Sequence, residues 1–101
     1  VEVGGRRITA PKVIVATGGR PARPDIPGIR DVPTLDSTSL LDLDQLPESL
    51  IFLGGGYIGV ELAQMMARMG VKVAMVCRSR LLPQVEPEVS VALTNVFRGE
   101  G

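Results

Sequence analysis

The fold is decided by one stretch of the sequence, Leu50-Ile51-Phe52-Leu53-Gly54-Gly55-Gly56-Tyr57-Ile58-Gly59-Val60-Glu61. The apolar run from Leu50 to Leu53 predicts a buried strand of a parallel sheet, because no polar residue interrupts it. The three glycines that follow predict a sharp turn out of this strand.

A helix and a second strand are predicted after the turn. Apolar residues recur at helical spacing, and Gly70 supplies a C-terminal stop. The next run, Val71 to Val76, predicts a second strand. The strand, the helix and the second strand together have the length expected of a βαβ unit, which is ~30 residues. The sequence therefore predicts an α/β fold with a parallel βαβ unit. The helical apolar positions are Ile58, Leu62, Met65, Met66 and Met69.

Gly54, Gly56 and Gly59 occupy the three glycine positions of a Gly-x-Gly-x-x-Gly dinucleotide fingerprint. In such a fingerprint the first glycine makes the turn, the second lets a pyrophosphate approach the backbone, and the third lets the helix pack closely on the strand. The helix N-terminus adds unpaired N–H groups and the positive end of the helix dipole. The alternative is a glycine turn with a purely structural role, but the flanking strand and helix favour nucleotide binding.

The end of the second strand predicts which dinucleotide is bound. NAD-binding proteins carry Asp or Glu there, which bonds the ribose 2′-hydroxyl. Here Cys77 stands at that position, followed by Arg78 and Arg80. A 2′-phosphate needs positively charged donors and would be repelled by a carboxylate. The sequence therefore favours NADPH over NADH, and the alternative is that both arginines are solvated loop charges.

The N-terminal half of the chain carries different signals. Val1 to Thr9 predicts a hairpin that turns at Gly4-Gly5. Lys12 to Gly19 predicts an apolar, β-branched strand buried on both faces, which suits a sheet whose other strands lie outside this chain. Four prolines between Arg20 and Pro33 predict an extended connection.

Two further helices are predicted around the βαβ unit. Asp36-Ser37-Thr38-Ser39 predicts the cap of a short helix over Leu40 to Leu43. Pro87-Glu88 predicts the start of a last helix, because proline suits the first helical turn. One face of that helix is expected to carry Val89, Leu93, Val96 and Phe97.

The composition excludes several classes of function. The chain has 101 residues, 11 basic and 11 acidic side chains, one cysteine and no histidine. The zero net charge gives no argument for a nucleic-acid or membrane partner, and no apolar run approaches the ~20 residues that span a bilayer. Without histidine there is no His-based triad or His metal site. A single cysteine excludes an internal disulfide and indicates a reducing cytoplasm. Because two parallel strands do not form a stable sheet alone, we expect the chain to be a piece of a longer parent protein.

Four motifs follow one another along the chain: Ile14-Val15-Ala16-Thr17-Gly18-Gly19-Arg20-Pro21, Ile26-Pro27-Gly28, Leu46-Pro47-Glu48-Ser49-Leu50, and Gly54-Gly55-Gly56-Tyr57-Ile58-Gly59-Val60-Glu61-Leu62-Ala63. In this order they resemble the class I pyridine nucleotide–disulfide oxidoreductases. Further segments, Asp36-Ser37-Thr38-Ser39-Leu40-Leu41, Arg78-Ser79-Arg80-Leu81-Leu82-Pro83 and Glu86-Pro87-Glu88, are similar to the mercuric reductase branch. The dihydrolipoamide dehydrogenase branch is the nearest alternative.

The resemblance implies a division of the chain and a function for the parent protein. Residues 1–19 would be the last strands of an FAD-binding domain, residues 20–47 a proline-rich linker with a short helix, and residues 48–101 the N-terminal half of a Rossmann-type NAD(P)H-binding domain. The parent would be a homodimeric flavoprotein that passes a hydride from NADPH to FAD, and electrons on to a disulfide and a substrate such as Hg(II). An alternative from another class is a non-catalytic nucleotide-binding regulatory module. The Val13 to Gly18 strand disfavours this alternative, because a stand-alone nucleotide-binding module needs no strand from another sheet.

The resemblance also implies roles for single residues. Thr17 and Gly18 would run close to the flavin, Tyr57 would cover its nicotinamide face, and Glu61 would lie near the nicotinamide. Glu61 is also expected in the first helical turn, where the helix dipole favours an acid. Arg78 would bind the 2′-phosphate, and Arg80 would substitute for a second family arginine that Gln84 replaces. The predicted cofactor-binding residues are thus Thr17, Gly18, Gly54, Gly56, Tyr57, Ile58, Gly59, Glu61, Arg78 and Arg80. No catalytic residue and no metal ligand is predicted within this chain.

Overall fold

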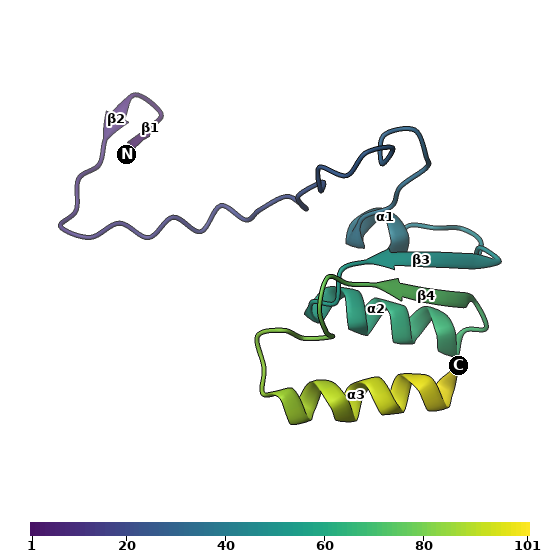
Figure 1. Ribbon diagram of the computed structural model, residues 1–101. Helices are drawn as coiled ribbons and strands as arrows, with labels where there is room; N and C mark the ends of the chain where they lie inside the picture. The colour runs from purple at the N-terminus through teal and green to yellow at the C-terminus, as the bar shows by residue number, and fades with distance from the viewer.

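The computed structural model describes residues 1–101. Figure 1 shows a small N-terminal hairpin, then an extended segment, and then a layered unit of strands and helices. Its elements, in order, are β1 (Glu2–Val3), β2 (Arg6–Arg7), α1 (Ser37–Leu41), β3 (Ser49–Leu53), α2 (Tyr57–Arg68), β4 (Lys72–Val76) and α3 (Pro87–Glu100). No helix has the length and apolar character needed to cross a membrane.

The predicted βαβ unit is confirmed. Strands β3 and β4 pair in parallel, with Leu50 opposite Val73 and Leu53 opposite Val76. Helix α2 connects them and packs against the sheet, and α3 lies along α2 (Figure 1). Because the strands are parallel, their carboxyl ends meet at one edge, where the glycine turn follows β3 and Cys77 follows β4.

The predicted stop of α2 at Gly70 is also confirmed. Gly70 has a φ of +90°, a left-handed conformation that glycine adopts without a Cβ clash. The N–H of Val71 donates to the carbonyl of Met66 at 3.1 Å, and the N–H of Gly70 donates to that of Ala67 at 2.9 Å. This is a Schellman ending, in which the residue after glycine contacts the last turn. Val71 and Met66 are both buried in one cluster with Leu40.

The expectation that the β3 run is buried is only partly confirmed. Leu50 and Phe52 are half-buried and pack against the cluster of Leu40, Met66 and Val71. Ile51 and Leu53 alternate with them and are 69% and 49% exposed. The helices of this chain cover only the face that carries Leu50 and Phe52, so the opposite face has no covering layer.

The strand predicted over Lys12 to Gly19 is not formed. These residues are extended in Figure 1, but they pair with no other strand, and Ile14 and Val15 are 91% and 80% exposed. A strand requires a hydrogen-bonding partner, and no other segment of the chain lies beside this one. The hairpin predicted before it is confirmed, with Glu2 opposite Arg7 around Gly4-Gly5.

The short helix begins earlier than predicted, at Ser37 instead of Leu40, and it ends at Leu41. Its cap is the predicted one: the Asp36 carboxylate accepts hydrogen bonds from the N–H groups of Thr38 and Ser39 at 3.0 and 2.9 Å. Because these amides belong to the first turn of the helix, the helix starts directly after the capping residue.

Helix α3 begins at Pro87 as predicted, but its apolar face is only partly as expected. Leu93 and Phe97 are half-buried and pack against a second cluster of Val60, Leu81 and Leu82. Val89 and Val96 are 47% and 48% exposed. The covered stripe instead includes Ser90, which is buried and lies one helical turn before Leu93 and Thr94.

Candidate functional site

The glycine turn joins β3 to α2 within three residues. Gly54 has a φ of +109°, which confirms the predicted sharp turn and disfavours any residue with a Cβ. Its N–H donates to the carbonyl of Val76 at 2.8 Å, so the turn begins while the chain is still paired with β4.

Gly59 brings α2 close to the turn. A Cβ atom at Gly59 would lie 3.1 Å from the carbonyl oxygen of Gly54 and 4.0 Å from Cε of Met75. This is tighter than ordinary van der Waals contact, so a side chain here would push the helix away from the strand end. The close packing expected of the third glycine is therefore present.

Gly56 has a different environment. A Cβ atom there would meet no atom within 4 Å, so the space beside this backbone is open. Gly56 caps α2 without any side-chain hydrogen bond, and the first turn of the helix contains no acidic residue. The open space and the N-terminal amides fit an approaching phosphate group, because such amides are donors without helical partners.

The expectation that Glu61 lies in the first helical turn is wrong. Helix α2 begins at Tyr57, so Glu61 stands in the second turn. Glu61, Tyr57 and Ile58 are all exposed, Tyr57 at 56% and Ile58 at 62%. Their proposed contacts with a cofactor stay predictions.

The carboxyl end of β4 places Arg78 at the same sheet edge as the turn. Arg78 is exposed and takes part in no side-chain hydrogen bond or salt bridge of the structure, and Cys77 before it is half-buried with a free thiol. Arg80 is half-buried instead. Its Nη2 donates to the carbonyls of Pro83 and Val85 at 3.2 and 2.7 Å, and its Nη1 is buried without a partner.

The turn has a second contact surface, at Gly55, that was not predicted from the sequence. Gly55 is buried, and the N–H of Leu82 donates to its carbonyl oxygen at 2.6 Å. Gly55 is a free position in the fingerprint pattern, so the pattern assigns it no role. The apolar pair Leu81-Leu82, lying among polar and charged loop residues, is the signal that could have indicated a buried loop.

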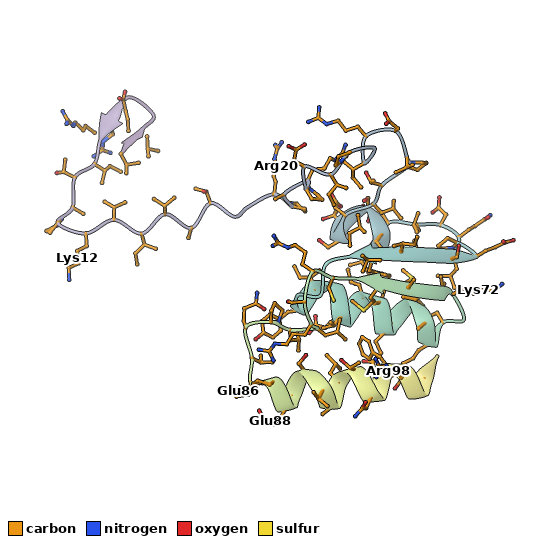
Figure 2. The ribbon with its side chains drawn as sticks, in the orientation of Figure 1. Lys12, Arg20, Lys72, Glu86, Glu88 and Arg98 are labelled. Atoms are coloured by element: carbon orange, nitrogen blue, oxygen red, sulfur yellow. The ribbon has the colours of Figure 1, made fainter.

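Thr17 and Gly18 are not brought to the turn. Residues 1–28 are exposed throughout, and Figure 2 shows Lys12 and Arg20 on the extended segment, with Lys12 far from the layered unit. Their placement beside a flavin stays a prediction.

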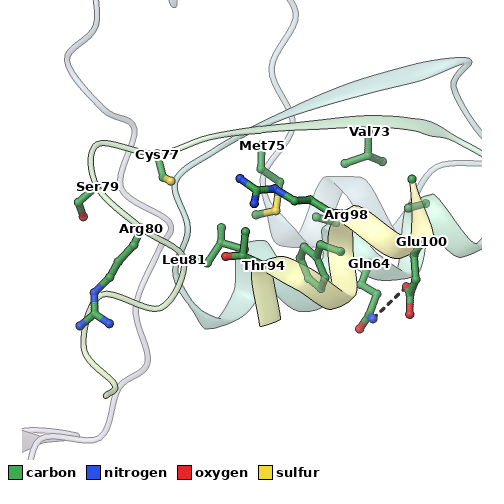
Figure 3. Close-up of a pocket in the computed structure, with 14 residues that line it drawn as sticks. Gln64, Val73, Met75, Cys77, Ser79, Arg80, Leu81, Thr94, Arg98 and Glu100 are labelled. Carbon is green, nitrogen blue, oxygen red and sulfur yellow. Dashed lines mark hydrogen bonds between the residues drawn. The ribbon is translucent and has the colours of Figure 1, made fainter. Parts of the chain in front are cut away.

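A cleft of the chain lies apart from most of the predicted site residues. It has a volume of about 480 Å³ and lies between β4, α2 and α3 (Figure 3). Of the predicted site residues it contains only Arg80, and Cys77, Arg98 and Glu100 are among its other lining residues. No group of three or more His, Cys, Asp or Glu side chains is placed to hold a metal ion.

Three ionisable groups have shifted pKa values, and all lie outside the predicted site. The pKa of Glu100 is lowered, first by a hydrogen bond from Arg68 and then by one from Gln64, and the same carboxylate raises the pKa of Arg68. The Arg68 Nη2 to Glu100 Oε1 distance is 2.6 Å, and Gln64 Nε2 donates to Oε2 at 3.0 Å. The pKa of Asp36 is lowered by the N–H of Ser39. These groups hold α3 to α2 and cap α1.

Known proteins are similar to this chain over nearly all of its length. The chain is 46% identical over 98 residues to a mercuric reductase of Streptomyces lividans, and 44% identical over 102 residues to one of Bacillus cereus. These alignments cover 97% and 100% of this chain but 21% and 16% of the two relatives. The chain thus spans about a fifth of the length of the relatives it matches.

A solved structure gives the same result. The HOCl-induced flavoprotein disulfide reductase RclA of Escherichia coli, in a Cu(II) complex, superposes with a TM-score of 0.73 at 42% identity, over 81% of this chain and 19% of that one. The profile of the family described as pyridine nucleotide-disulphide oxidoreductase matches residues 1–101. The chain therefore belongs to the pyridine nucleotide-disulphide oxidoreductase family.

Proposed function

We propose that residues 48–101 are the NADPH-binding part of an FAD-dependent oxidoreductase of the mercuric reductase type. One observation carries the proposal: a glycine turn with open space at Gly56 and a close helix contact at Gly59 shares a sheet edge with the exposed Arg78. A phosphate-binding turn and a free guanidinium side by side suit a dinucleotide with a 2′-phosphate.

The residues of this chain would bind and orient the dinucleotide. Gly56 and the first amides of α2 would hold the pyrophosphate, while Arg78 would hold the 2′-phosphate through paired N–H donors. Tyr57 and Glu61 would lie beside the nicotinamide ring. When bound, the nicotinamide supplies a hydride and the flavin accepts it. The sequence also predicts Arg80 as a second phosphate ligand, but its Nη2 already donates to the carbonyls of Pro83 and Val85.

The N-terminal segment would belong to the flavin side of the same enzyme. Residues 1–19 would complete an FAD-binding domain, with Lys12 to Gly19 pairing in a sheet supplied by the parent protein and Thr17-Gly18 running beside the flavin. The high exposure of Ile14 and Val15 supports this, because apolar β-branched residues are normally buried in sheets. Residues 20–47 would then link the two cofactor domains.

The substrate and the assembly are further parts of the proposal. The names of the relatives support Hg(II) as the substrate, since both are mercuric reductases. We further propose that the parent protein is a cytoplasmic homodimer, as the family resemblance implies. Cys77 is the only cysteine of the chain, so the redox disulfide would come from the rest of the parent. A dihydrolipoamide dehydrogenase type of enzyme is the second candidate. The absence of an acidic residue at the end of β4 disfavours NADH as the nucleotide of such an enzyme.

The test of the cofactor assignment is the charge reversal Arg78→Glu in the FAD-loaded parent protein. We expect the affinity for NADP⁺ to fall at least tenfold, because charge-assisted hydrogen bonds are each worth about 1.5–3 kcal/mol. The affinity for NAD⁺ should hold or rise. Arg6→Glu in the hairpin is the matched control, with the same charge change at an exposed site. An unchanged ratio of NADP⁺ to NAD⁺ affinity would overturn the role of Arg78.

The substrate assignment has its own experiment. The FAD-loaded parent should consume NADPH with Hg(II) as the electron acceptor, each hydride delivering the two electrons that convert Hg(II) to elemental mercury. Consumption of NADH with lipoamide, and none with NADPH and Hg(II), would support the second candidate.

A further inference from the structure

The connection between β4 and α3 packs against the inner side of the glycine turn. Its Leu82 N–H donates to the Gly55 carbonyl at 2.6 Å. A Cβ atom at Gly55 would lie 3.2 Å from both the Arg80 carbonyl oxygen and the Leu81 Cδ2. Residues 80–82 thus fix Gly55 in place, while the next residue, Gly56, faces open space.

The backbone of this connection is strained where it meets the turn. Leu82 has a φ of +47°, and it is the only residue other than glycine with a positive φ. A large side chain in this conformation is an outlier that persists only when its surroundings hold it. Leu81 and Leu82 are each 8% exposed and pack with Val60 of α2. This packing helps to keep Leu82 in its strained conformation.

Hydrogen bonds from Arg80 and Ser90 also fix this connection. Nη2 of Arg80 donates to the carbonyls of Pro83 and Val85, which closes the loop on itself. The hydroxyl of Ser90, buried on α3, donates to the Leu81 carbonyl at 2.5 Å. In Figure 3 the Arg80 side chain follows its own loop and points away from Arg98.

These contacts leave Arg80 poorly placed to reach a ligand. Nη2 is committed to two carbonyls, and Nη1 is buried, so a phosphate could contact it only after the loop had opened. Arg78, two residues earlier, is exposed and has none of these contacts.

We propose that Arg80 is a positioning residue: by clamping residues 80–85 it holds Leu82 against Gly55 and so fixes the turn that receives the pyrophosphate. This rests on the proposed binding of a dinucleotide at the turn, and it replaces the role of Arg80 as a phosphate ligand. Because NADPH and NADH share the pyrophosphate, the clamp serves both cofactors equally.

The experiment compares Arg80→Met and the conservative Arg80→Lys in the FAD-loaded parent protein. Arg98→Met is the matched control, since Arg98 lines the same cleft and forms no side-chain hydrogen bond with the loop. Three quantities are measured: the dissociation constants for NADP⁺ and NAD⁺, and amide hydrogen exchange at Gly54–Gly56 and residues 80–85.

For Arg80→Met we expect both dissociation constants to rise by about the same factor, near tenfold, with faster exchange in both segments. Arg80→Lys should show a smaller rise of both. A selective loss of NADP⁺ binding would overturn the proposal and make Arg80 a phosphate ligand. Unchanged exchange at Gly54–Gly56 would overturn it too, even if the wild-type parent binds neither nucleotide and the proposed function itself has failed.

Discussion

A Cβ atom on Gly59 would lie 3.1 Å from the carbonyl oxygen of Gly54, so the start of α2 and the end of β3 are already in contact. Replacing a helical glycine by alanine normally gains up to about 1 kcal/mol. Forcing a methyl group against a fixed backbone atom costs about 1–3 kcal/mol. We therefore expect Gly59→Ala to lower the melting temperature of the parent protein, and a higher melting temperature would contradict the close contact.

Gly56 offers the complementary prediction. Its φ of −79° suits any residue, its Cβ position is open, and serine is a preferred helix cap. Gly56→Ser should therefore keep or raise the melting temperature. Its side chain would nevertheless enter the space assigned to the pyrophosphate, so calorimetric titration should show NADP⁺ affinity falling about tenfold or more, or ~1.4 kcal/mol. Unaltered affinity would show that no phosphate approaches this backbone.

The glycine turn was predictable from the sequence because its constraints are local. The conformation of Gly54 and the start of α2 depend on residues within one turn of chain, which the glycine spacing encodes. The contact of Leu82 with Gly55 was not predictable in this way, because it joins residues far apart in sequence and depends on a strained backbone that no residue pattern signals.

The segment from Lys12 to Gly19 shows a different limit. Its apolar, β-branched residues correctly indicate a preference for extended chain, which the structure has. Burial, however, also requires another strand or layer that covers the segment, and no such element lies within these 101 residues. The error over Val89 and Val96 has a similar origin, because the covered face of α3 depends on the loop beside it, where the Ser90 hydroxyl donates to the Leu81 carbonyl.

Gly70 and Gly99 form a matched pair for the role of backbone conformation. Gly70 ends α2 with a φ of +90°, whereas Gly99 lies inside α3, and both have open space around the Cβ position. Gly70→Ala should destabilise the parent protein by about 1 kcal/mol through backbone strain. Gly99→Ala should be neutral or stabilising by a few tenths of a kcal/mol. Urea unfolding of the two variants measures both, and equal destabilisation would contradict the Schellman ending.

Asp36 allows the cap of α1 to be separated from its charge. Its carboxylate accepts hydrogen bonds from Thr38 and Ser39, and Leu40 of the same helix is buried in the core. Asp36→Asn keeps an accepting oxygen, so thermal unfolding at pH 7 should change little. Asp36→Ala removes the acceptor and should lower the melting temperature clearly. Equal effects of the two substitutions would show that the charge, and not the cap, stabilises the helix.

Glu100 predicts a dependence of stability on acid pH. The hydrogen bond from Arg68 lowers its pKa below the ordinary value of 4.5, so the folded chain favours the ionised carboxylate. A lowered folded pKa contributes stability above the unfolded pKa, and the contribution is lost as the pH falls through the folded pKa. The melting temperature of the wild type should therefore exceed that of Glu100→Gln at pH 7, and the two should converge as the pH falls through the lowered pKa of Glu100. Arg68→Met should remove the same difference, and added salt should reduce it because the pair is exposed. A gap between wild type and Glu100→Gln that is independent of pH would mean that Glu100 holds α3 to α2 by packing and not by charge.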